Sequence, residues 1–93
     1  MTKNLDKNTL GYRLAKVRFE LGFNKKQLAD KIKVSPQCVA RYENNERVPD
    51  YNYLEKLVNM FDVDAEYIFG KSEVIFKETV YTVSFRDLKP NQD

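Results

Sequence analysis

The chain has 93 residues, a net charge of +2, no histidine and one cysteine. This length fits one compact domain, and a single cysteine excludes both an intrachain disulfide and a Cys/His zinc cluster. Without histidine, a glycine-rich phosphate loop or an activated nucleophile, the sequence disfavours an enzyme, and no cofactor is expected. It has no signal-peptide core and no apolar run near the roughly 20 residues of a membrane span, so we expect a cytoplasmic protein.

Five polar residues stand where helix N-caps are expected, each followed by apolar residues at helical spacing: Thr9, Asn24, Ser35, Asp50 and Asp64. The apolar residues behind these caps are the predicted core: Leu10, Leu14, Val17, Leu21, Leu28, Ala29, Ile32, Val39, Tyr42, Tyr53 or Leu54, Leu57, Val58, Phe61, Tyr67 and Ile68. Gly22 and Gly70 are placed to end the first and fifth helices. Residues 9–70 are therefore predicted to form five short helices, after a flexible N-terminus at residues 1–8.

The pattern changes after Gly70. Residues 73–88, EVIFKETVYTVSFRDL, are rich in Val, Ile, Phe, Tyr and Thr and lose the helical period, which indicates a strand. The expected fold is thus an all-α five-helix domain with a C-terminal β-strand or hairpin extension at residues 71–88, then a disordered tail at residues 89–93. An exposed apolar edge invites pairing, so this segment is predicted to hold a homodimer through Val80, Tyr81, Val83 and Phe85. A hairpin folded back on the same subunit is the alternative.

The distribution of charge suggests a polyanionic partner. Residues 1–49 have a net charge of +6, and residues 50–93 have a net charge of −4. A basic half of this kind is typical of a surface that meets nucleic acid. A solvated surface whose charges segregate by chance explains the same distribution equally well.

The second and third predicted helices, joined by a tight turn, have the pattern of a helix-turn-helix. In the third, Val39 and Tyr42 face inward, whereas Gln37 and Arg41 share the opposite face. The major groove of DNA admits one helix, in which Gln can pair with adenine and Arg with guanine. The predicted base-reading residues, including three that offer small apolar contacts, are Gln37, Arg41, Pro36, Cys38 and Ala40. A solvent-facing helix of an all-α domain is the alternative, and Cys38 is interpreted as a half-buried filler rather than a redox sensor.

Three stretches of this sequence resemble the lambda-repressor-like helix-turn-helix domain of the Cro and phage-repressor (XRE) family. They are LGYRLAKVR, GFNKKQLADKIKVSPQCVARYENNERVP and LEKLVNMFDVDAEYIFG, within residues 10–70. The resemblance implies a five-helix domain whose third helix enters the major groove of double-stranded DNA, usually as a homodimer on a near-palindromic operator. The function expected is that of a small Cro-like or phage-type repressor of a prokaryote or phage, with no small-molecule ligand.

The resemblance also implies roles for single residues. The predicted phosphate contacts, from the family pattern and from local charge, are Lys25, Lys26, Ser35, Asn44, Asn45, Arg47 and Arg13. Arg18 and Glu43 match a family pair that forms an internal salt bridge, so both are interpreted as structural. The family often has Gly where this chain has Lys33 and Asn45, and Asn adopts a left-handed conformation more easily than Lys.

Two other functions fit the same sequence. An antitoxin or a restriction-modification controller would bind DNA through the same motif. A protein-interaction adaptor would use the fold without DNA, and would be expected to have more apolar residues at positions 37, 40 and 41. Arg41 and the basic first half argue against the adaptor.

Overall fold

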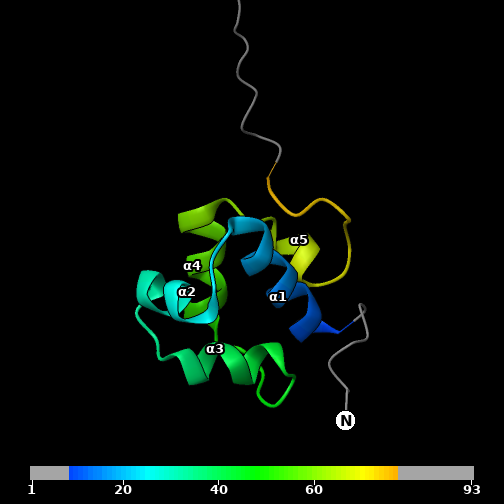
Figure 1. The fold of residues 1–93 in the computed structure, drawn as a ribbon. Helices are drawn as coiled ribbons and strands as arrows, with labels where there is room; N and C mark the ends of the chain where they lie inside the picture. The colour runs from blue at the N-terminus through cyan, green and yellow to red at the C-terminus, as the bar shows by residue number, and fades with distance from the viewer. Residues whose placement is uncertain (1–8, 78–93) are drawn as a thin grey trace, which may run out of the picture.

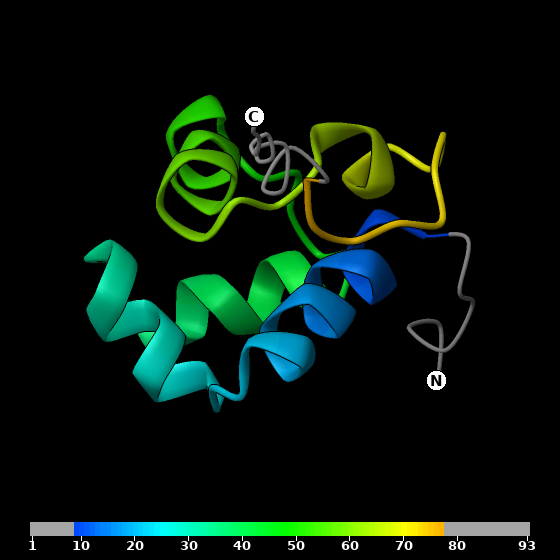
Figure 2. The same cartoon turned by 90° about the horizontal axis from the view of Figure 1, so that it is seen from above.

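The structure is a computed structural model that describes residues 9–77, and these residues form five helices (Figure 1). In chain order they are α1 (Leu10–Leu21), α2 (Lys25–Ile32), α3 (Pro36–Glu43), α4 (Tyr51–Phe61) and α5 (Ala65–Ile68). α3 packs against both α1 and α2, and α1 also packs against α5. Seen from above, α4 and α5 lie on one side of the unit made by the first three helices (Figure 2). None of the helices in this part of the chain is long and apolar enough to cross a membrane.

All five predicted N-caps are confirmed. Each cap residue has extended backbone, and its side-chain oxygen accepts a hydrogen bond from a backbone N–H two or three residues later. These bonds satisfy N–H groups that have no partner inside the helix. At α2 the Gln27 side chain also accepts from the Asn24 N–H at 2.8 Å, which completes a capping box. The helices therefore begin where local side-chain chemistry favours them.

Left-handed residues end three of the helices. Gly22 ends α1 at φ 82°, as predicted. Lys33 ends α2 at φ 65° and Asp62 ends α4 at φ 59°, although neither is glycine. A left-handed conformation costs a non-glycine residue about 1–2 kcal/mol, so packing of the flanking helices must hold these two turns.

The core lies where the five helices meet. Its buried apolar residues are Leu14, Val17, Leu28, Ala29, Ile32, Val39, Tyr42, Tyr53, Leu57, Val63, Tyr67 and Ile68. Tyr53 is buried and Leu54 only partly so, which decides an alternative that helical spacing left open. Val63 was not predicted, because it lies in the connection between α4 and α5 rather than on a helical stripe. The partly buried Phe23 and Phe61 extend the core through an edge-to-face contact, with ring centroids 5.7 Å apart.

The predicted C-terminal strand is wrong for the part of it that the structure describes. Residues 71–77 form no strand, and Phe76 makes only an isolated antiparallel bridge with Val63. The Lys77 N–H donates to the Asp62 carbonyl and the Asp64 N–H to the Ile75 carbonyl, both at 2.8 Å. The connection between α4 and α5 offers only three residues to pair with, which is too short for a ladder. The predicted dimerisation residues Val80, Tyr81, Val83 and Phe85 lie outside the described residues, as do both predicted flexible ends.

Candidate nucleic-acid interface

The back of α3 is fixed in the core. Val39 is fully buried, and Tyr42 packs edge-to-face on Tyr53 with ring centroids 4.6 Å apart. Before α3 begins, the Val34 N–H donates a hydrogen bond to the Ala29 carbonyl of α2, and this bond holds the short link between the two helices. The predicted helix-turn-helix arrangement of these two helices is therefore present.

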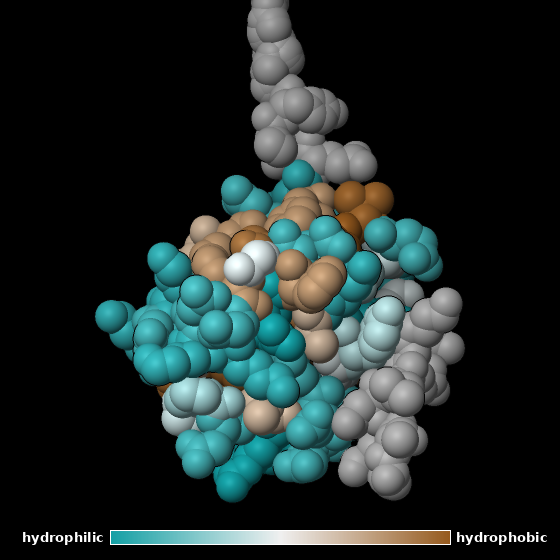
Figure 3. Space-filling view, viewed as in Figure 1, coloured by the Kyte–Doolittle hydropathy of each residue, from teal (hydrophilic) through white to brown (hydrophobic). Residues whose placement is uncertain are grey.

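The front of α3 is open to solvent. Pro36, Gln37 and Arg41 are exposed, whereas Cys38 and Ala40 are half-buried at the sides of the helix. α3 lies at the lower edge of the molecule in Figure 1, and that face is predominantly hydrophilic in Figure 3. The structure thus brings all five predicted base-reading residues onto one short helix. Among them Gln37 and Arg41 are the exposed polar side chains, each able to form two hydrogen bonds.

An ion pair joins α1 to the end of α3. The Arg18 Nε lies 2.8 Å from Glu43 Oε2, and a second guanidinium nitrogen donates to Oε1 at 3.0 Å. The remaining terminal nitrogen of Arg18 donates to the Phe23 carbonyl at 3.0 Å. The Glu43 side chain is 4% exposed and that of Arg18 is 17% exposed. This bidentate, nearly buried pair is the one implied by the family resemblance, and it ties α1 to the end of α3.

The first turn of α2 presents positive charge beside α3. Lys25 and Lys26 are both exposed there, and the Lys26 ammonium lies 3.7 Å from Asp30 in a mostly exposed pair. The N-terminus of a helix itself attracts anions, which adds to the charge of the lysines. Ser35 caps α3 by accepting from the Cys38 N–H, so its hydroxyl hydrogen can still be donated to a phosphate. All three side chains are exposed to solvent.

The loop after α3 has a structural role that the sequence interpretation missed. Asn45 has φ 63°, and its Oδ1 accepts a hydrogen bond from the Gly11 N–H at 2.8 Å. A Cβ at Gly11 would collide with the Glu43 carbonyl and lie 2.7 Å from Asn45 Oδ1, so only glycine fits there. The amide oxygen of Asn45 is thus engaged, which leaves its NH₂ group for a phosphate. Asn44 is half-buried and Arg47 is exposed in the same loop. The sequence did contain one signal of this contact. Gly11 stands in the first turn of a helix although Ala is preferred in helices by about 1 kcal/mol, which suggests that another element lies too close for a side chain.

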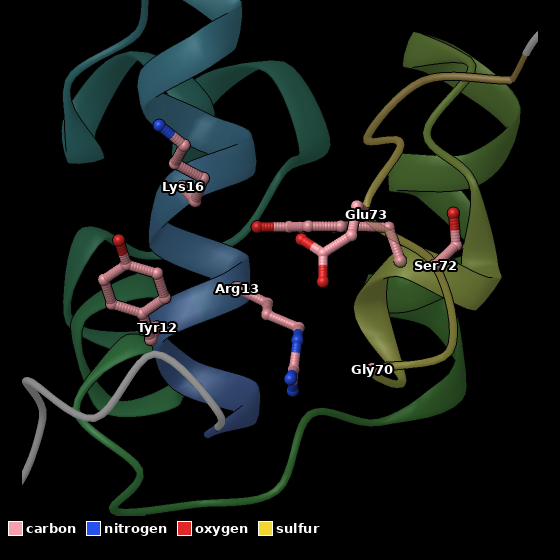
Figure 4. A pocket seen from close by; sticks show the side chains of 7 residues that line it. Tyr12, Arg13, Lys16, Gly70, Ser72 and Glu73 are labelled. Carbon is pink, nitrogen blue, oxygen red and sulfur yellow. The ribbon is translucent and has the colours of Figure 1, made fainter.

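Arg13 lies on α1, with its side chain directed toward the end of α5. Its guanidinium lies 3.1 Å from the position that a Cβ on Gly70 would take, at the end of α5. It faces a pocket of about 280 Å³ between α1 and the segment after α5, as Figure 4 shows. The other residues that line this pocket are Tyr12, Lys16, Tyr67, Gly70, Ser72 and Glu73. The pocket has both signs of charge, and among the described residues no cluster of His, Cys, Asp or Glu could hold a metal ion.

Comparison with known proteins identifies the same domain. Residues 11–74 match a family model described as a helix-turn-helix domain. The chain is similar to the HTH-type transcriptional regulator ImmR of Bacillus subtilis (strain 168), with 36% identity over 66 residues. That match covers 71% of this chain and 52% of ImmR, so the chain spans about half the length of the curated relative it matches. No solved structure matches the chain.

Proposed function

The chain belongs to the phage-repressor-like helix-turn-helix family, and on this basis we propose that it binds double-stranded DNA and regulates transcription. The observation that supports this most is the two-sided α3. Its back is fixed by Val39, Tyr42 and Glu43, while its front presents polar groups to solvent. A helix that is rigidly held and polar on one face meets the requirements of major-groove recognition. The relative ImmR is named a transcriptional regulator, which supports the same assignment.

The proposed base contacts come from the front of α3. Gln37 pairs with adenine and Arg41 with guanine, and each good bidentate pair discriminates against the wrong base by about 1–3 kcal/mol. Pro36, Cys38 and Ala40 contribute apolar contacts, for example with a thymine methyl group. These contacts set the sequence of the site, whereas contacts to phosphate set the register and orientation of the protein on the duplex.

The proposed phosphate contacts surround α3. They come from the first turn of α2, from the cap of α3 and from the loop that follows it: Lys25, Lys26, Ser35, Asn44, Asn45 and Arg47. Asn45 would contribute its NH₂ group, because its oxygen binds Gly11. Arg13, on α1, is the remaining proposed contact. The positive members also explain why the basic charge of the chain is concentrated in its first half.

The full proposal is a cytoplasmic, small Cro-like or phage-type repressor that acts as a homodimer. The part of the C-terminal segment that follows Lys77 would hold the two subunits together, and the two α3 helices would lie about 34–36 Å apart, one turn of DNA. The operator would then be a short inverted repeat. A protein-interaction adaptor is the alternative, and DNA is favoured over it because the exposed Gln37 and Arg41 can each form two hydrogen bonds with a base edge.

The test is a fluorescence-anisotropy titration with a pool of random duplexes at several salt concentrations. The four positive residues among these contacts, Lys25, Lys26, Arg47 and Arg13, predict a slope of log K against log salt of about −3.6, from about −0.9 per neutralised phosphate. Lys25→Ala should reduce the magnitude of the slope by about 1, whereas Lys71→Ala, in the exposed segment after α5, should leave it unchanged. Binding that barely changes with salt would contradict the phosphate contacts, and no binding to any duplex would favour the adaptor.

A further inference from the structure

An apolar groove of about 340 Å³ lies between α4 and α5. Leu54, Val58 and Ile68 form its apolar lining, with Ile68 fully buried and the other two partly buried. Two aromatic residues at its margin are largely open to solvent, Tyr51 at 73% and Phe69 at 57% exposure. Large apolar side chains gathered on one surface mark a site where something else packs.

The described chain ends beside this groove. The Lys77 N–H donates to the carbonyl of Asp62, the residue that caps the C-terminus of α4, and Phe76 bridges Val63. In Figure 2 the orange end of the described chain lies between α4 and α5. Lys77 is therefore within about one helical turn of Val58 and Asn59, at one end of the groove.

The sequence that follows matches the groove in chemistry and length. Tyr81, Val83 and Phe85 alternate with Thr82 and Ser84, so an extended chain would have one apolar face. The helical part of the groove, from residue 59 back to residue 51, is about 12 Å long at a rise of 1.5 Å per residue. Eight extended residues after Lys77 can span about 26 Å, which is more than the groove requires.

We propose that residues 79–85 of this chain lie extended in the groove between α4 and α5 of the same subunit. Tyr81, Val83 and Phe85 face the apolar lining, and the polar side of the segment faces solvent. The tether favours this occupant over a free molecule, because a segment joined by one or two residues has an effective concentration in the millimolar range.

This inference deepens the proposed homodimer and rests on that part of the proposed function. An isolated two-stranded ribbon is marginally stable in water unless it also packs against a helix or a further strand. A segment docked on its own α4 and α5 still has a free backbone edge that can pair with its counterpart in a second subunit. Packing in the groove would thus stabilise a strand pair between subunits that would be only marginally stable alone.

The experiment is a cysteine cross-link in the full chain with Cys38→Ala. Glu55→Cys, at a half-buried residue that lines the groove, is combined with Val83→Cys, because Val83 lies opposite Glu55 when Tyr81 is beside Asn59, and oxidised glutathione is added to dilute protein. The product is identified by mass and by mobility on a non-reducing gel. We expect an intrachain disulfide that forms at least about tenfold faster than in the control, which pairs Val83→Cys with Asp30→Cys on the exposed face of α2. If Glu55→Cys does not fold, the exposed Asn59→Cys paired with Tyr81→Cys replaces it.

Each outcome decides the inference. A covalent dimer from the Glu55 and Val83 pair would show that the segment of a second copy occupies the groove, and would overturn the assignment to the same subunit. A rate equal to that of the control would overturn docking altogether. The unmodified chain is titrated with DNA in parallel: intact DNA binding without cross-linking overturns only this inference, whereas cross-linking without DNA binding overturns only the proposed function.

Discussion

The two sides of α3 differ in how strongly the rest of the molecule constrains them. On the back, Glu43 is held by two hydrogen bonds from Arg18, and Tyr42 packs on Tyr53. On the front, Gln37 and Arg41 extend into solvent. The difference separates two kinds of contribution within eight residues of one helix. Changes at the back should alter the free energy of unfolding, and changes at the front should alter DNA affinity alone.

The largest expected effect is at the buried ion pair. Glu43→Ala leaves the Arg18 guanidinium largely buried without its carboxylate, which should lower the free energy of unfolding by about 3–5 kcal/mol. Urea denaturation followed by circular dichroism measures this loss. Gln37→Ala, on the front of the same helix, is the matched control and should stay within about 0.5 kcal/mol of the wild type. Equal losses in the two variants would remove the distinction between the sides.

Gly11→Ala tests the close approach of α1 to the end of α3. Helix propensity alone predicts that this change stabilises α1 by about 1 kcal/mol. The new Cβ would collide with the Glu43 carbonyl and crowd Asn45, so we expect a net destabilisation of about 1–3 kcal/mol. Thermal unfolding gives the sign directly, and a more stable variant would show that the loop yields easily.

Tyr53→Phe tests the polar group that the back of α3 covers. The Tyr53 hydroxyl is buried and has no hydrogen-bond partner among the described residues, so its removal should leave the protein at least as stable, by up to about 1 kcal/mol. Burial raises the pKa of Tyr53, because the ionised form is disfavoured inside the core. The folded state therefore keeps the Tyr53 proton at a pH at which the unfolded state has lost it. The free energy of unfolding is highest below the unfolded pKa of about 10 and decreases as pH rises above that value. Urea midpoints at pH 8 and pH 11 should therefore fall less in Tyr53→Phe than in the wild type, and an identical fall would contradict the assignment.

The smallest effects are expected at two left-handed turns that flank the interface. Lys33→Gly removes the strain of a left-handed lysine and should raise stability by about 0.5–1 kcal/mol, after the greater chain entropy of glycine is subtracted. Asn45→Gly relieves less strain and loses the hydrogen bond from Gly11, so it should lower stability by about 1 kcal/mol. Melting temperatures of the two variants should move in opposite directions. A shift of both in the same direction would show that Asn45 acts only through its backbone conformation.

The helices could be predicted from sequence because the information is local. Ser35 followed by Pro36 marks a helix start within two residues, and Gly22 marks an end. The contact between Gly11 and Asn45 could not be predicted in this way, because it joins residues 34 positions apart. The strand expected after Gly70 failed where it is described for a related reason. Composition indicates extended backbone, but a strand also needs a partner of sufficient length.

The candidate site also combines features that local sequence predicts with features that depend on contacts between helices. Helical spacing alone was enough to place Gln37 and Arg41 together on the exposed face of α3. The partnership of Arg18 with Glu43 came from the family resemblance, since spacing says nothing about contacts between helices. Arg13 was grouped with the phosphate contacts for its charge, and the sequence did not indicate that its guanidinium lies beside Gly70. The position of a residue on its own helix does not say which other element covers it.

The most direct test of DNA reading by the front of α3 is selection of random duplexes, followed by sequencing, for the wild type and Arg41→Ala. The wild type should enrich an inverted repeat. Arg41→Ala should lose about 1–3 kcal/mol of affinity and relax its preference at one base position in each half-site, with unchanged stability. Identical base preferences at every position in the two proteins would contradict the proposal that Arg41 reads DNA.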